Sequence, residues 1–235
     1  MRLAAALVAA LLAALLAAPA AAEIVSARYA EPTTRYAHGV LGDAVEWGAL
    51  DLRLSDGRNR RIILPKGRVF EDTEPRLADL DGDGNPEIIA VESHLDRGAR
   101  LSIYNENGLL AATPFIGTRH RWLAPVGAAD LDGDGRVEIA YVDRPHLART
   151  LRIWRFENGR LHEIASAEGL TNHRIGDDFI SGGIRECGQG PELVLASPDW
   201  SRLLLARLVT DRIETRPAGL PATAAGFRAA LACRN

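Results

Sequence analysis

Short segments rich in apolar residues recur along most of the chain, and turn-forming residues separate them. Such segments, bounded by turns, indicate β-strands. Asn and Gly at 105–108 and 158–159, and the turn at 55–57 within a hairpin at 43–65, supply tight connections. The pattern predicts nine strands in three groups, at 87–91, 101–104, 109–113, 137–142, 151–156, 161–165, 192–196, 202–207 and 212–215.

The three groups are copies of one unit. Segments 77–88 and 128–139 nearly match, a third and eroded copy occupies 183–193, and a fourth is placed at 40–43. Repeats of about fifty residues indicate propellers or other arrays, and four-stranded antiparallel units around an axis are propeller blades. The sequence predicts an all-β fold, a small β-propeller of about four four-stranded antiparallel blades; an open or a five-bladed form is the alternative. The predicted repeats are 24–70, 71–121, 122–171 and 172–217, followed by a C-terminal tail.

The first 22 residues differ from the rest. Arg2 precedes an apolar run at 3–18, and small residues at 19–22 stand before Glu23. The small residues favour a cleaved secretory signal peptide over a transmembrane anchor. We therefore expect a single domain of residues 23–235 that is periplasmic or secreted and has no membrane span.

Two cysteines, Cys187 and Cys233, lie in the predicted mature chain. In an oxidising compartment a matched pair usually forms a disulfide, which would tie the C-terminal tail to the last repeat. Two buried thiols are the alternative.

Overall composition narrows the class of protein. With a formal net charge of -3, 47% hydrophobic and 25% charged residues, the chain is typical of a globular protein. No strong positive charge is present to attract nucleic acid. We expect a monomer.

Two Gly-punctuated loops carry carboxylates at alternate positions. Calcium prefers six to eight oxygen ligands, which such a loop supplies from side chains and one backbone carbonyl. We predict Ca²⁺ at two sites, the carbonyls coming from Asn85 and Arg136. The expected ligands are Asp79, Asp81, Asp83, Asn85 and Glu87 in the first loop and Asp130, Asp132, Asp134, Arg136 and Glu138 in the second. Solvated acidic turns without metal are the alternative.

The surroundings of these loops separate them from EF-hand or dockerin loops. An EF-hand takes its last acidic ligand from position twelve on a helix, whereas Ala90 and Tyr141 stand there, within β-rich segments. The arrangement resembles the FG-GAP or VCBS repeats, also seen in the α-subunit propeller of integrins, over roughly residues 73–197. The resemblance implies the same ligands and a loop between two strands of one blade. The Gly-Ala-Pro stretch of that family is absent, and the third loop keeps only Glu186 and Glu192 as acids, so we expect no ion there.

Polar connections precede the first strand of each predicted repeat, and in a propeller such loops gather at one end of the axis. This arrangement would suit an anionic or sugar-like ligand. Alternatively, the same residues pair with one another and hold the repeats together. The candidate ligand-binding residues are His38, His120, Arg121, Trp122, His173 and Arg174.

The sequence contains no motif for a serine or cysteine nucleophile, a phosphate loop or a zinc protease, so we assign no catalytic residue. We predict a module that binds a protein or a glycan. The alternatives are a hydrolase or lyase acting on an extracellular polymer, with a histidine as base, and a subunit of an envelope assembly. Convergence of the three histidines in one pocket would favour the enzyme.

Overall fold

The protein is described by a computed structural model over residues 22–234, in which sixteen strands and one helix form the regular structure. The expected signal peptide, 1–22, lies outside the described residues except for Ala22. All described strand pairs are antiparallel, and the nine strands predicted from the sequence are present. The prediction of an all-β fold is confirmed.

The first half of the chain forms one eight-stranded sheet. The short strand β4 pairs with β2 through Trp47 and Phe70, and with β6 through Phe70 and Glu92. The first two predicted repeats therefore share a sheet instead of forming two separate four-stranded sheets. Its strands are β1 (Ile24–Thr33), β2 (Glu46–Leu54), β3 (Asn59–Ile63), β4 (Arg68–Phe70), β5 (Arg76–Ala78), β6 (Glu87–His94), β7 (Gly98–Asn105) and β8 (Gly108–Ala112).

The second half forms two sheets of four antiparallel strands, each in sequence order. The inner strands β6 and β10 are buried along both faces, whereas the outer strands β3 and β16 are mostly exposed. The strands of these two sheets are β9 (Leu123–Ala129), β10 (Glu138–Asp143), β11 (Thr150–Glu157) and β12 (Arg160–Glu168), then β13 (Gly183–Glu186), β14 (Pro191–Ala196), β15 (Leu203–Val209) and β16 (Arg212–Pro217).

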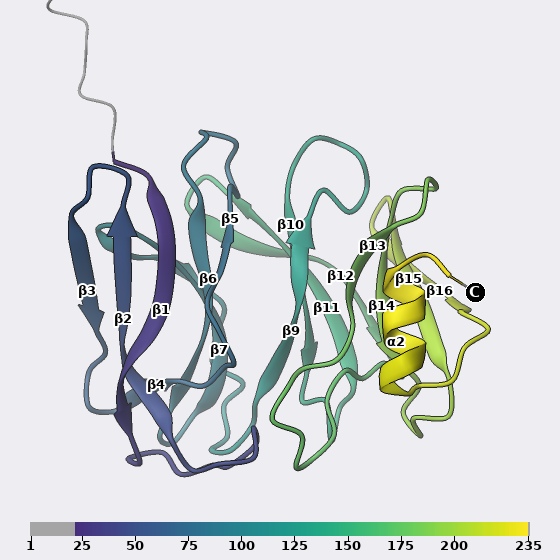
Figure 1. Cartoon of the computed structure of the whole chain (residues 1–235), viewed down its shortest axis with the longest axis horizontal. Coiled ribbons are helices and arrows are strands. Elements are labelled where there is room, and N and C mark those ends of the chain that lie inside the picture. Colours follow the sequence, from purple (N-terminus) through teal and green to yellow (C-terminus); the bar gives the residue numbers. More distant parts are fainter. Residues whose placement is uncertain (1–21, 235) are drawn as a thin grey trace, which may run out of the picture.

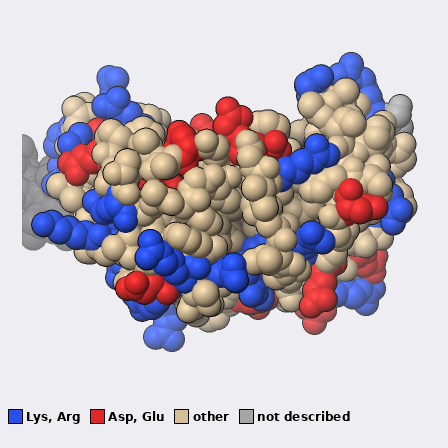
Figure 2. All heavy atoms as spheres, turned by 90° about the horizontal axis from the view of Figure 1, so that it is seen from below, with Lys and Arg blue, Asp and Glu red and all other residues tan. Residues whose placement is uncertain are grey.

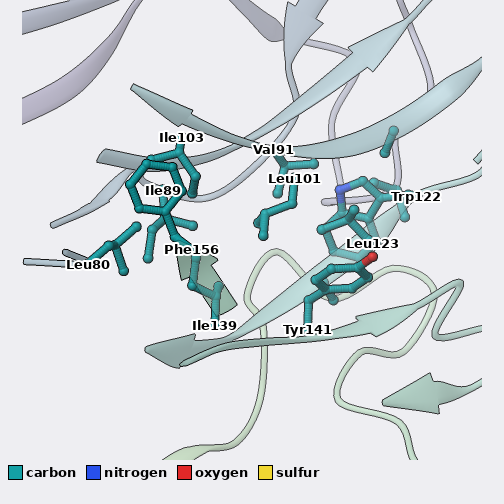
Figure 3. Packing of buried hydrophobic residues seen from close by; sticks show 13 residues of the cluster. Leu80, Ile89, Val91, Leu101, Ile103, Trp122, Leu123, Ile139, Tyr141 and Phe156 are labelled. Atoms are coloured by element: carbon teal, nitrogen blue, oxygen red, sulfur yellow. The ribbon is translucent and has the colours of Figure 1, made fainter. Parts of the chain in front are cut away.

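Apolar layers fill the space between successive sheets. Figure 3 shows Val91 and Leu101 of the first sheet facing Leu123 and Tyr141 of the second. A second cluster joins the second and third sheets. The sheets stand side by side, with the first and the last at opposite ends of the long axis, so the described residues form a row (Figure 1). Each fully buried aliphatic or aromatic side chain in these layers contributes about 1.5–3 kcal/mol.

One helix, α2 (Ala224–Leu231), follows the last strand, where the sequence analysis expected only a tail. The Thr223 side chain caps it by accepting a hydrogen bond from the Gly226 N–H, and Phe227 packs on the third sheet. Cys187 and Cys233 form the predicted disulfide, with their Cα atoms 5.6 Å apart. Among the described residues no helix is long and apolar enough to cross a membrane.

Candidate functional sites: acidic loops and a histidine cluster

The first acidic loop connects β5 to β6 at the upper edge of the molecule (Figure 1). Carboxylate oxygens of Asp79, Asp81 and Glu87 lie within 4.8 Å of one another. Asp79 accepts hydrogen bonds from the N–H groups of Gly82 and Gly84, at 2.9 and 3.0 Å, and the backbone of Leu80 donates to Glu87 at 2.9 Å. Both glycines have positive φ, 77° and 89°, which lets the loop turn inward. The backbone thus holds three carboxylates together.

The carboxylates of this loop border open space. A cavity of about 260 Å³ is bordered by Asp81, Asp83, Glu87 and Asn105. Burial, together with the negative charges of Asp81 and Asp83, raises the pKa of Glu87 to about 7. A calcium ion would offset this repulsion, and hard carboxylate oxygens are the donors it prefers. The residues present therefore fit calcium, although Asp83 is exposed and does not belong to the group of three.

The second acidic loop, between β9 and β10, repeats this backbone. Asp130 accepts from the N–H groups of Gly133 and Gly135, and Leu131 donates to Glu138 at 2.8 Å. Oxygens of Asp130, Asp132 and Glu138 again lie within 4.8 Å of one another. The two predicted loops therefore share one conformation.

A guanidinium group distinguishes the second loop from the first. Nη2 of Arg155 lies 3.0 Å from Asp132, 3.1 Å from Asp134 and 2.5 Å from Glu138. Arg136 also pairs with Asp134, at 2.5 Å. Sequence reasoning missed Arg155 because it lies on β11, and only the strand register, in which Arg155 stands opposite Glu138, brings it to the loop.

In the last predicted repeat, 172–217, arginines surround the one buried carboxylate. Glu192 lies 2.7 Å from Arg185 and 2.6 Å from Arg216. Although burial opposes the shift, hydrogen bonds from these two arginines lower the pKa of Glu192. Glu186 keeps the role of Asp79, because it accepts from the N–H groups of Gly188 and Gly190.

The paired loops, each set between two antiparallel strands, are the feature shared with a known repeat. Residues 79–141 match the FG-GAP-like repeat. This match includes both acidic loops and confirms the resemblance predicted from the sequence. No curated protein matches the chain.

Two solved structures are similar to part of the chain. The exotype rhamnogalacturonan lyase YesX is 18% identical, with a TM-score of 0.46, over 74% of this chain and 42% of the lyase. The rhamnogalacturonan lyase YesW is 16% identical, with a TM-score of 0.45, over 74% of this chain and 43% of the lyase. The chain thus spans less than half the length of either structure.

The opposite end of the molecule from the FG-GAP-like acidic loops carries a histidine cluster. The rings of His38 and His120 stack with centroids 4.7 Å apart, and Trp122 contacts His173 edge to face at 5.0 Å. Nε2 of His146 lies 2.9 Å from Nδ1 of His173. Counting Arg121, which borders a small cavity with His38, His120 and Trp122, the structure therefore brings together five of the six predicted ligand-binding residues and adds His146. The sequence analysis considered only the connections that precede the first strand of each repeat, and His146 follows β10. Because β9 and β10 are antiparallel, β10 ends at the edge of the sheet where β9 begins, so His146 lies beside the predicted residues.

The two predicted arginines are placed differently. Arg121 borders a small cavity together with His38, His120 and Trp122. Arg174 instead lies over the Trp200 ring, 4.2 Å from its centroid, and donates to the carbonyl of Ala222 near α2. Arg174 is thus oriented away from the cluster.

A buried carboxylate anchors the histidine cluster. Glu71 is fully buried, lies 2.5 Å from Nδ1 of His38 through one oxygen and accepts from Ser93 through the other. Its backbone carbonyl accepts from Nε1 of Trp122 at 2.8 Å. Burial raises the pKa of Glu71, although His38 and Ser93 oppose the shift. These contacts fix the loop positions.

Little space remains among the histidines. The cavity that His38, His120 and His146 border has a volume of about 30 Å³, roughly that of one water. Burial, with a contribution from His173, lowers the pKa of His146 to about 4, so this ring is neutral at pH 7. Burial also lowers the pKa of His120 and of His173. His38 packs on His120, and His146 packs on His173, so the side chains themselves fill most of the space between these loops.

Proposed function

We propose that this protein is a calcium-stabilised module of the β-propeller type that acts outside the cytoplasm and binds a protein or a glycan through its histidine-bearing loops. The carrying observation is that loops from successive repeats meet around His38, His120 and His173 and leave a cavity of only about 30 Å³. A packed loop surface supports recognition of a macromolecule better than turnover of a small group in a deep pocket.

Exposed apolar side chains on the same loops support binding. Leu147 is 58% exposed beside His146, and Ile175 and Phe179 are 81% and 50% exposed in the loop that carries His173. Exposed apolar groups close together, with charged residues around them, are typical of interaction surfaces. Figure 2 shows this end of the molecule, where Lys and Arg side chains lie on one side of a largely uncharged area and Asp and Glu side chains lie on the other.

The second candidate is a hydrolase or lyase that acts on an extracellular polymer. It is favoured by the short chain of contacts from Ser93 through Glu71 to His38, which resembles the way a carboxylate orients a catalytic imidazole. The small cavity weighs against it, because a sugar ring needs several times that volume. We therefore place binding first.

Location outside the cytoplasm is supported by the apolar N-terminal segment of the sequence and by the disulfide between Cys187 and Cys233. Whether the protein is periplasmic or secreted does not alter the proposal, since both compartments are oxidising.

Calcium binding can be tested without knowing the partner. We expect thermal unfolding of residues 23–235 to shift upward with calcium and downward with excess chelator. Calcium at ten times its Kd should increase the free energy of unfolding by about 1.4 kcal/mol for each site. Asp81→Ala should reduce the shift, whereas Asp56→Ala, in an exposed turn of the β2–β3 hairpin, should leave it unchanged. An unchanged melting temperature in the unsubstituted protein, with no metal by elemental analysis, would remove calcium from the proposal.

Partner binding requires a test at the loop surface. A photo-crosslinking side chain at Phe179 should capture a discrete protein in the producing cells, whereas the same group at Ile63, exposed on β3, should not. A glycan partner would instead appear as binding on a glycan array that Phe179→Glu abolishes and Ile63→Glu retains. If neither assay distinguishes Phe179 from Ile63, the loop surface is not the binding site.

A further inference from the structure

We propose that the guanidinium of Arg155 takes the place of the metal ion in the second acidic loop, so that calcium binds to the first loop alone. The inference rests on the calcium part of the proposed function and corrects the expectation of two calcium sites.

The position of Arg155 carries the proposal. One nitrogen, Nη2, contacts Asp132, Asp134 and Glu138, at 3.0, 3.1 and 2.5 Å, and all three were predicted calcium ligands. The Arg155 side chain is only 8% exposed, and its Nε makes a second bond to Glu138 at 2.6 Å. A guanidinium keeps its charge at every accessible pH and offers several donors in a fixed plane. It thus supplies the positive charge that calcium would otherwise bring.

The first loop has no such group. Ile88 pairs with Tyr104 as Ile139 pairs with Trp154, so Asn105 occupies the position that Arg155 occupies in the next repeat. Asn105 borders the cavity of about 260 Å³ with Asp81 and Glu87. Within the described residues, no Arg, Lys or His nitrogen lies within 4.0 Å of a carboxylate oxygen of this loop. Its negative charge is therefore left for a cation from solution.

Arginines also neutralise the third loop, in the last predicted repeat. Leu193 pairs with Ala206, which places Arg207 opposite Glu192, and Arg185 and Arg216 contact the same carboxylate directly. The first two loops carry four carboxylates each and the third carries two, and among the described residues arginines contact these carboxylates only in the second and third loops. A buried carboxylate needs a positive charge beside it, which either a guanidinium group or a metal ion can provide.

The decisive variant gives the second loop the residue that the first loop has. Arg155→Asn should raise the calcium stoichiometry from one to two ions per chain in isothermal titration calorimetry of residues 23–235. In chelator the variant should melt below the unsubstituted protein, and calcium should restore it. Asp132→Ala in the otherwise unsubstituted chain should leave the stoichiometry at one.

The reciprocal variant keeps the proposal testable if Arg155→Asn does not fold. Asn105→Arg should weaken calcium binding at the first loop by at least about tenfold, whereas Asn105→Gln, of similar polarity but no charge, should change it less. The proposal would be overturned if the unsubstituted chain bound two calcium ions. It would also be overturned if folded Arg155→Asn bound no additional calcium ion, or if Asn105→Arg bound calcium with unchanged affinity. If Asp81→Ala still removes one bound calcium ion in any of these cases, calcium binding at the first loop stands and only the role of Arg155 fails.

Discussion

The carboxylate of Glu71 lies 2.5 Å from the imidazole of His38, 33 residues earlier in the chain. The backbone carbonyl of the same residue accepts a hydrogen bond from Trp122, 51 residues later. One buried residue thus joins the β1–β2 connection to the start of β9, and we call the contacts among His38, Glu71 and Trp122 the joint. The histidine-bearing loops depend on the joint, because His120 packs on His38 and His173 packs on Trp122.

Removing the indole donor should weaken this joint measurably. Trp122→Phe keeps most of the packing but leaves the Glu71 carbonyl unpaired, and we expect a loss of about 1–3 kcal/mol in the free energy of unfolding by denaturant titration. Trp122→Ala also opens a cavity in the first apolar layer and should cost about 3–5 kcal/mol. Trp154→Phe is the matched control, because Nε1 of Trp154 is buried without a hydrogen-bond partner among the described residues. Equal losses in the two Phe variants would contradict a role for the Trp122 hydrogen bond.

A second buried carboxyl near this joint should make stability depend on pH. Burial, with the charges of Glu71 and Asp43, raises the pKa of Glu46 to about 9. The folded state therefore holds the proton more tightly than the unfolded state. The stabilisation is complete below pH of about 4.5 and is lost as the pH rises through about 9.

Glu46→Gln keeps a neutral polar group and should remove this dependence. Relative to the variant, the unsubstituted protein should lose up to about 1.4 kcal/mol per pH unit between pH 5 and 9. Urea unfolding at several pH values and constant calcium measures the difference, with Glu74→Gln, at an exposed position, as control. If the free energy of unfolding changed with pH in the same way in the unsubstituted protein and in Glu46→Gln, Glu46 would be ionised in the folded state.

Local patterns were sufficient to predict nine of the sixteen described strands, the hairpin at 43–65 and the acidic loops, because apolar segments, turn residues and Asp–Gly spacing act within a few residues. Features that depend on partners distant in the sequence were missed. Arg155 reaches the second loop only through the β10–β11 register, and β4 merges two repeats by pairing with β2 at Trp47 and with β6 at three positions. Helix α2 was missed because its short, alanine-rich sequence is helical mainly through its Thr223 cap and the packing of Phe227.

The disulfide should account for a large share of the stability of the C-terminal region. Cys187 and Cys233 are 46 residues apart, and chain-entropy reasoning assigns about 3–4 kcal/mol to closing a loop of this length. The double variant Cys187→Ala and Cys233→Ala should lose that amount in denaturant titration. Hydrogen exchange should increase first in α2, which packs on β14 and β15 beside the bond. An unchanged exchange rate in α2 would indicate that packing of Phe227 alone holds the helix.

Gly98, at the start of β7, should be intolerant of any side chain. Its φ of 70° is unfavourable for other residues, and a Cβ there would lie 2.3 Å from the Thr118 carbonyl oxygen and 2.7 Å from that of Arg121. Those carbonyls belong to the loop that carries His120, so Gly98→Ala would push this loop outward. Gly57→Ala has a similar φ, 84°, but its Cβ would meet nothing within 4 Å. The control should lose about 1–2 kcal/mol for its left-handed backbone, and Gly98→Ala clearly more. If the two variants lost the same free energy of unfolding in denaturant titration, the loop that carries His120 could move aside without destabilising the protein.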